Sequence, residues 1–309
     1  MKARWLVLLL IVMMAGETLA KKLYKFQDEN GVWHYGDKPP DTNEAVEVRQ
    51  LTPAKRQLVS LEKRGDKYSP YFFAINKYPG PIEIEVDWEK HENVIANPPL
   101  PRRFVVGSGQ SADLFNIRTT VATRASRFTL QYRYMIGQPL SDYSSSHHYL
   151  PPIAPGSHFQ ITQAFGGAFS HQDEQNRYAI DIKMPVGTPV YAARGGIVME
   201  VEDDYFKSGT RQAYANKANS IRILHDDGSM AIYAHLQLEK AQVSPGVQVS
   251  AGDLIGYSGN TGFTTGPHLH FAIQVNQGMQ LASVPFQFVY INGQVKEPQQ
   301  GEWLEGVTP

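Results

Sequence analysis

Short β-type runs of apolar and polar residues fill the chain after residue 68. The clearest is Ile82–Val86, in which isoleucine or valine alternates with glutamate. Successive side chains of a strand point to opposite faces, so this pattern predicts a strand with one buried face and one wet face. Similar runs lie at 71–74, 103–106 and 128–135, separated by Pro-Gly, Pro-Pro and Ser-Gly pairs. Together they predict a small β-sandwich-like domain at 68–140.

A second group of predicted strands follows residue 155, with glycine at nearly every break. It includes a hairpin in which 221–224 and 230–233 flank the turn Asp227-Gly228. Residues 202–218 interrupt the strands and read as an exposed insertion, the kind of long loop that more often shapes a site than fills a core. The fold class expected for the chain is all-β.

The remaining segments complete the predicted domain organisation. Residues 22–40 predict a hairpin around Asn30-Gly31, part of a short N-terminal hairpin module at 21–50. Its pattern of Tyr, Asp, Asn-Gly and Asp-Lys-Pro-Pro resembles a small domain of uncharacterised role that follows the signal peptide of proteobacterial envelope proteins. The segments without clear periodicity are assigned to a linker at 51–67, a linker at 141–154 and a C-terminal tail at 291–309.

The first 20 residues have the layout of a secretory signal peptide. Lys2 and Arg4 precede an apolar run at 5–15, and a polar break then leads to Thr18-Leu19-Ala20. The alternative, an uncleaved anchor, is disfavoured because the apolar run is short for a bilayer span. We expect the protein in the periplasm or cell envelope, with no integral membrane domain after signal cleavage.

Charge and cysteine content narrow the partners and the compartment. The 29 Lys and Arg residues nearly balance 30 Asp and Glu residues, for a formal net charge of −1. No strongly basic footprint for nucleic acid is present. There is no cysteine, which excludes disulfides and thiol-linked lipid, so the folded cores must supply the stability.

Two histidines stand together after a glycine-rich stretch at 252–266. In a strand, His268 and His270 point to the same side while Leu269 points to the other. Histidine is also an ordinary component of polar strand faces, so this pair alone does not establish a site. The surrounding glycines indicate a tightly turned backbone, and Pro267 fixes the main chain just before the strand.

Three more side chains, those of His171, Asp181 and His235, can join this pair. His171, Asp181 and His270 would supply two imidazoles and a carboxylate, a ligand set that suits a zinc ion with an open position for water. His235 and His268 would then be free to act on water or substrate. Taken singly, an aspartate on a strand or a histidine at a strand end is more often a solvated or turn residue.

Four ordered motifs together resemble the lysostaphin and LytM type of zinc metallopeptidases, which cut peptide bonds in bacterial peptidoglycan. The motifs are FSHQDEQNRYAIDI, MPVGTPVYAARGGIV, IRILHDDGSMAIYAHL and VSAGDLIGYSGNTGFTTGPHLHF. The resemblance covers about 155–290 and implies a compact antiparallel β metallopeptidase domain. By motif position it implies His171, Asp181 and His270 as Zn²⁺ ligands and His235 and His268 as the catalytic histidines.

The sequence departs from many relatives at two places. Nine residues separate His171 from Asp181, where many relatives have a shorter spacing, which leaves Asp173 as a second candidate ligand. The Tyr-Ala-Ile-Asp ending at 178–181 favours Asp181. Ala272 stands where relatives frequently have glutamate, but this is not a ligand position. No HExxH glutamate is present, so His268 or His235 is the available general base.

Three functions compete on this evidence. The first is an exported zinc endopeptidase that acts on the peptide stems or cross-links of peptidoglycan. The second is a metal-free LytM-like regulator that binds the wall and activates other hydrolases; occupation of all five expected positions argues against it. The third is a carrier or phosphotransfer domain, because residues 247–253 are similar to lipoyl and biotinyl hairpin barrels. It is disfavoured because the Asp227-Gly228 tip lacks a lysine. An envelope protein partner is possible in either of the first two cases, and residues 21–140 have no assigned role.

Overall fold

The computed structural model describes residues 22–29, 31–50, 57–66, 69–144 and 146–309. These residues form β-strands joined by turns, with one short 3-10 helix at Gln212–Tyr214 among them, so the predicted all-β class is confirmed. None of the described helical segments has the length and apolar character to cross a bilayer. The predicted signal peptide lies outside the described residues. The chain divides into two units, 1–56 and 57–309.

The N-terminal unit is a three-stranded antiparallel sheet in the order β2-β1-β3. Its strands are β1 (Lys22–Gln27), β2 (Trp33–Gly36) and β3 (Glu47–Gln50). The predicted hairpin joins β1 to β2, and Asp28 closes it by accepting the Val32 main-chain N–H at 2.9 Å. Leu23 is fully buried.

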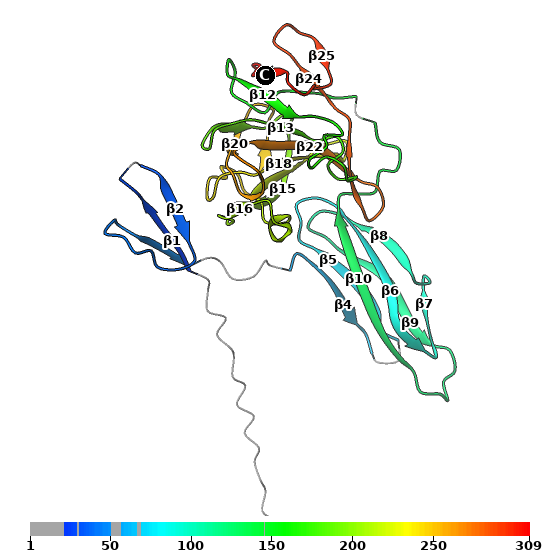
Figure 1. The fold of residues 1–309 in the computed structure, drawn as a ribbon. Coiled ribbons are helices and arrows are strands. Elements are labelled where there is room, and N and C mark those ends of the chain that lie inside the picture. The colour runs from blue at the N-terminus through cyan, green and yellow to red at the C-terminus, as the bar shows by residue number, and fades with distance from the viewer. Residues whose placement is uncertain (1–21, 30, 51–56, 67–68, 145) are drawn as a thin grey trace, which may run out of the picture. The chain divides into compact units, whose positions relative to one another are not determined.

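Residues 57–140, which we call the accessory lobe, contain two antiparallel sheets (Figure 1). The four-stranded sheet consists of β4 (Val59–Arg64), β5 (Tyr71–Asn76), β9 (Ser111–Thr119) and β7 (Val94–Asn97), in that order. The three-stranded sheet consists of β10 (Arg127–Ile136), β6 (Ile82–Glu92) and β8 (Arg102–Val106). β4 lies within the predicted linker 51–67: Val59 is buried there and β5 pairs along its length.

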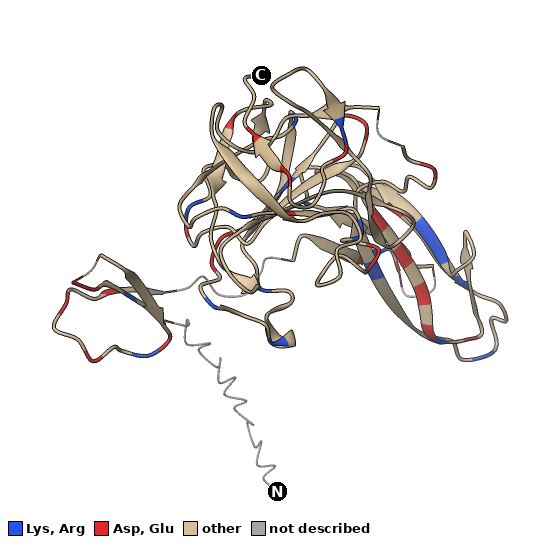
Figure 2. Ribbon diagram, turned by 45° about the horizontal axis from the view of Figure 1, so that its top comes forward, with Lys and Arg blue, Asp and Glu red and all other residues tan. Residues whose placement is uncertain are grey.

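One face of the three-stranded sheet carries the acidic residues that alternate along β6. Glu85 receives hydrogen bonds from Arg103 on β8 at 2.6 Å and from Arg133 on β10 at 2.7 Å. These hydrogen bonds hold the pKa of the Glu85 carboxyl below its usual range. In Figure 2 the red positions of β6 lie beside blue positions on the neighbouring strands. The opposite face carries the buried Ile82, Ile84 and Val86, as the alternation predicts.

Residues 141–309, the C-terminal lobe, are built on a nine-stranded antiparallel sheet. Its path is β19 (Gln248–Val249), β15 (Gly196–Glu202), β17 (Ser220–Leu224), β18 (Met230–Ala234), β22 (Leu269–Asn276), β13 (Ile180–Ile182), β12 (His158–Gln163) and β26 (Trp303–Glu305), with β23 (Leu281–Val284) paired to β22. β22 lies in the middle of this path, and all eight of its residues are buried.

The lobe also contains shorter sheets beside the large one. Two of its segments, predicted from the sequence to be a linker and a tail, contribute to its core. The shorter strands are β11 (His148–Tyr149) with β24 (Gln287–Val289) and β25 (Val295–Lys296), β14 (Pro189–Tyr191) with β20 (Leu254–Tyr257), and β16 (Ser208–Gly209) with β21 (Gly262–Phe263). Tyr149 and Ile153, in the predicted linker 141–154, are buried in the core. Leu304, in the predicted tail 291–309, is also fully buried, because β26 extends the large sheet beside β12.

The accessory and C-terminal lobes share a core. Met199 of β15 and Met230 of β18 are buried in the same hydrophobic cluster as Ile82 and Ile84 of β6. Buried Glu83 accepts hydrogen bonds across the boundary from Asn276 Nδ2 at 2.9 Å and from the Met279 main-chain N–H at 2.7 Å. The β6 end of the accessory lobe is therefore packed directly on the sheet that contains β22.

Candidate metal centre

The pairing of strands brings Asp181 and His270 together. Asp181 on β13 lies directly across from His270 on β22, and Ala234 on β18 lies across from His270 on the other side. The two side chains approach to 2.9 Å between Asp181 Oδ1 and His270 Nδ1. Both side chains are largely buried. Sheet register alone therefore fixes two of the three predicted ligands.

His171 reaches the same point from the loop before β13. Its Nδ1 lies 3.0 Å from the Ala164 carbonyl oxygen, and its Nε2 lies 3.3 Å from Asp181 Oδ1. His171 is fully buried, yet its Nε2 has no hydrogen-bond partner among the described residues. Ligand atoms of His171, Asp181 and His270 all lie within 4.8 Å of one another, so the group could hold a metal ion. Asp173, the second candidate, is exposed and outside this group.

A fourth residue, Gln163, orients the carboxylate. Its Nε2 donates to Asp181 Oδ2 at 2.8 Å, from the position opposite Asp181 on β12. Burial favours the neutral carboxyl, but the neighbouring His171 and His270 favour its charged form and hold the pKa of Asp181 well below its usual range. Burial lowers the pKa of His171, but the Asp181 carboxylate outweighs that effect and raises it. The sequence carried no motif that marks Gln163.

His235 and His268 lie beside this group with their rings 4.5 Å apart. His235 Nδ1 is 2.7 Å from the Thr261 carbonyl oxygen, and His268 Nδ1 is 2.8 Å from the Gly266 carbonyl oxygen. Because a carbonyl oxygen only accepts, each Nδ1 carries the proton in the neutral ring, and each Nε2 presents its lone pair. The His268 Nε2 lies 3.7 Å from Asp181 Oδ1.

Burial keeps these two histidines neutral. It lowers the pKa of His235 to about 3, with further lowering by the neighbouring His268 and His270. Burial also lowers the pKa of His268, but the Asp181 carboxylate acts in the opposite direction by favouring the protonated ring. Both rings are therefore proton acceptors at neutral pH.

Buried Asn219 holds the backbone around His235, which has a φ of 63°. The Asn219 main-chain carbonyl accepts the Leu236 N–H at 3.1 Å. Its side-chain Oδ1 accepts the Tyr205 main-chain N–H, and its Nδ2 donates to the Tyr205 carbonyl oxygen, both at 2.8 Å. A left-handed φ is unfavourable for a non-glycine residue and persists only where its surroundings impose it. Asn219 thus ties the start of the predicted insertion 202–218 to the turn that presents His235.

Comparison with known proteins assigns this β domain to a class of peptidases. Residues 175–282 match Peptidase family M23, and this range contains Asp181, His235, His268 and His270. His171 lies four residues before it. The chain therefore contains a peptidase family M23 domain, as the four sequence motifs predicted. Residues 7–59 match a domain of unknown function, DUF4124.

Curated relatives align with the same part of the chain. Glycyl-glycine endopeptidase ALE-1 of Staphylococcus capitis is 37% identical over 101 residues, covering 33% of this chain and 25% of its own length. Peptidoglycan DD-endopeptidase ShyA of Vibrio cholerae is 41% identical over 95 residues, covering 31% of this chain and 19% of its own length. The chain thus spans a quarter or less of each of these relatives.

Among solved structures, the catalytic domain of lysostaphin from Staphylococcus simulans aligns with a TM-score of 0.29 and 27% identity. The alignment covers 46% of this chain and 88% of that one. The catalytic domain of the M23 protein EnpA from Enterococcus faecalis aligns with a TM-score of 0.33 and 26% identity, over 43% of this chain and 92% of that one.

Proposed function

We propose that the protein is an exported, zinc-dependent endopeptidase that hydrolyses the peptide stems or cross-links of bacterial peptidoglycan. The observation that carries the proposal is the grouping of His171, Asp181 and His270, with His235 and His268 beside them, in an M23 peptidase domain. The relatives support the substrate class, because their names describe glycyl-glycine and peptidoglycan DD-endopeptidases. Export is supported by the sequence of residues 1–20.

The three-residue group fits a zinc ion. Two imidazole nitrogens and one carboxylate oxygen are common zinc ligands, and three protein ligands leave a position open for catalysis. The buried His171 Nε2 lies 3.3 Å from Asp181 Oδ1 but has no hydrogen-bond partner among the described residues. A buried polar atom normally has such a partner, and a metal ligand position would account for its absence. Zinc, when bound, supplies a Lewis acid that activates water near neutral pH and polarises a carbonyl group.

His268 is the better general base of the two free histidines. Its Nε2 lone pair faces the Asp181 carboxylate, which favours the protonated ring that forms after proton transfer. His235 is a weaker base, since burial and two neighbouring imidazoles hold its pKa at about 3. In this proposal His268 takes the proton from the attacking water, and neutral His235 accepts a hydrogen bond at Nε2 and orients that water or the substrate.

The first test measures zinc content and wall digestion on one preparation of the full chain. We expect stoichiometric zinc and soluble peptide products from purified peptidoglycan, whose masses identify the bond that is cut. Removing zinc with a chelator should abolish digestion, and restoring zinc should recover it. A chain that binds no zinc and releases no products would contradict the proposal and favour the regulatory alternative.

The second test separates ligands from catalytic histidines. His171→Ala and His270→Ala should lose zinc and activity together, because each removes a ligand atom. His268→Ala should retain zinc and lose about 10²–10⁴-fold in turnover, the range typical of a lost general base, and His235→Ala should also retain zinc while turnover falls. His158→Ala, an exposed histidine of the same lobe, is the matched control. Zinc retained in both His171→Ala and His270→Ala would refute the ligand assignment.

A further inference from the structure

The nine-residue loop between His171 and Asp181 brings one side chain back onto the metal centre. Asn176 Oδ1 lies 3.2 Å from His270 Nε2, the ring nitrogen on the side away from Asp181. We propose that Asn176 is a positioning residue that holds His270 with its Nδ1 lone pair toward the candidate metal. This inference rests on the proposed function, because it concerns how a zinc ligand is oriented.

The neighbouring carboxylate of Asp173 sets the direction of the Asn176 amide. Asn176 Nδ2 lies 3.0 Å from each Asp173 carboxylate oxygen, and the Asn176 main-chain N–H donates to Asp173 Oδ1 at 3.0 Å. An ionised carboxylate only accepts hydrogen bonds, so the NH₂ group of the amide must face Asp173. The amide oxygen is therefore left facing His270.

This orientation selects one tautomer of His270. An amide oxygen only accepts, so the proton shared with Asn176 belongs to His270 Nε2. In a neutral imidazole the other nitrogen then carries the lone pair, and this is Nδ1, which lies 2.9 Å from Asp181 Oδ1. Histidines that bind metals generally donate their second N–H to an oxygen in this way, which fixes both ring orientation and tautomer.

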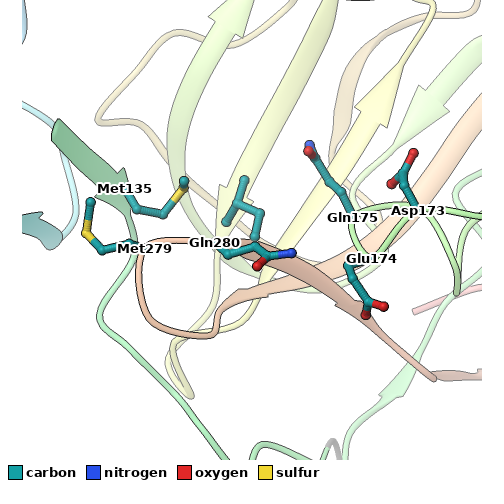
Figure 3. A pocket seen from close by; sticks show the side chains of 7 residues that line it. Met135, Asp173, Glu174, Gln175, Met279 and Gln280 are labelled. Atoms are coloured by element: carbon teal, nitrogen blue, oxygen red, sulfur yellow. The ribbon is translucent and has the colours of Figure 1, made fainter.

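Hydrogen bonds from two strands hold the loop in place. Gln274 Nε2 on β22 donates to the Gln175 carbonyl at 2.8 Å, and the Ser283 N–H and Oγ on β23 donate to the Glu174 carbonyl at 2.7 and 3.0 Å. Gln274 and Ser283 are both buried. Figure 3 shows this part of the loop, Asp173 to Gln175, beside the turn at Met279 and Gln280. Two residues of the loop backbone adjacent to Asn176 are thus anchored to the strand that bears His270 and to its neighbour.

The same contacts explain the long spacing between the first two predicted ligands. A short connection from His171 to Asp181 would leave the Nε2 side of His270 without this loop. The nine intervening residues carry both the amide that contacts the ring and the carboxylate that orients the amide. A role in turn formation alone would account for the contact with Asp173 but not for the contact with His270.

The test is the zinc dissociation constant of the full chain, measured by competition with a chromophoric chelator at neutral pH. Asn176→Leu removes the acceptor at similar size and should weaken zinc binding about 10–100-fold, the usual effect of losing such a partner. The exchange Asp173→Asn with Asn176→Asp keeps an amide–carboxylate pair and an oxygen toward His270, so it should recover most of the affinity. Gln172→Leu, at an exposed position of the same loop, should bind zinc as the wild type does.

Thermal unfolding of the metal-free proteins separates this role from a structural one. If Asn176→Leu is as stable as the wild type without metal and yet binds zinc more weakly, the positioning role is supported. If its affinity equals that of the wild type, or if the exchange variant is folded and recovers no affinity, the inference is overturned while the proposed function stands. If the wild type binds no zinc, both this inference and the proposed function are contradicted.

Discussion

His225 is a buried histidine outside the candidate metal centre. Its Nδ1 lies 2.8 Å from the Gly195 carbonyl oxygen, and its Nε2 is buried and has no hydrogen-bond partner among the described residues. Burial lowers its pKa from an ordinary value of 6.5 to about 4. Between pH 6.5 and about 4 the ring is therefore neutral in the folded protein and protonated in the unfolded chain.

This difference predicts an acid-sensitive stability. Because the folded-state pKa lies below the unfolded value, the contribution of His225 is fully present above pH 6.5 and is lost as the pH falls toward 4. The loss in unfolding free energy from this one group is about 3 kcal/mol. We expect the unfolding free energy of the metal-free protein, measured with denaturant, to decrease less between pH 6.5 and pH 4 for His225→Asn than for the wild type. His148→Asn, at an exposed position, should retain the wild-type slope, and parallel curves for the wild type and His225→Asn would contradict the assignment.

At the scale of single residues, the motifs and the fold supplied different parts of the candidate site. His171, Asp181 and His270 could be named from the sequence because they occupy positions in motifs, and the structure brings their ligand atoms within 4.8 Å. Gln163 and Asn176 could not, because their contacts depend on strand register and on how a loop folds back. Glutamine and asparagine in polar stretches have no pattern that distinguishes such contacts from ordinary solvation.

The turn after β20 sets the distance between the elements that carry His235 and His268. Gly259 lies against the main chain just after His235, and a Cβ atom placed on it would come within 2.5 Å of Leu236 C and Gln237 N. Gly259 also forms an isolated β-bridge with His268. This glycine is therefore required by a close approach of two backbones, neither of which can move away as a flexible side chain could.

We expect Gly259→Ala to increase the distance between the segments that carry His235 and His268. Relieving the clash should cost about 1–3 kcal/mol of unfolding free energy, the range found when packed sites are overfilled, and turnover should fall because His235 and His268 shift relative to each other. Zinc content should fall less than turnover, since the added Cβ atom meets Leu236 and Gln237 and none of the three predicted ligands. Gly266→Ala is the matched control, because a Cβ atom there has open space. Equal activity in Gly259→Ala and the wild type would refute this reading of the turn.

At the scale of elements, periodicity predicted some strands and missed others. Ile82–Val86 was recognisable because isoleucine or valine alternates with glutamate, and Ile82, Ile84 and Val86 are buried as expected. The expectation of a wet opposite face was wrong at Glu83, which is buried against the C-terminal lobe. β4 and β26 were assigned to a linker and a tail because the segments around them show no clear periodicity. Each stands at the end of its sheet and becomes a strand by pairing with one neighbour, β4 with β5 and β26 with β12. Strands of this kind are specified by the edge they join more than by their own pattern.

For the whole molecule, the shared core of the two lobes predicts that residues 141–309 are unstable on their own. Without the accessory lobe, Met199 and Met230 would lose the apolar partners that bury them. We expect the truncated protein to bind a hydrophobic dye and to unfold at a lower temperature than residues 57–309. In the longer protein, Met230→Ala should lower the unfolding free energy by about 2–5 kcal/mol. Equal stability of the two proteins would show that the shared cluster contributes little.

The junction formed by Glu83, Asn276 and the Met279 main chain limits which domain recombinations could have produced this protein. If the C-terminal lobe were fused to an unrelated domain, Met199 and Met230 would become an exposed hydrophobic patch. The Asn276 amide would also lose the Glu83 carboxylate that accepts its hydrogen bond. Substitutions at Met230 or Asn276 should consequently be accompanied by compensating ones around Glu83. In descent, residues 57–309 should therefore be inherited as one unit.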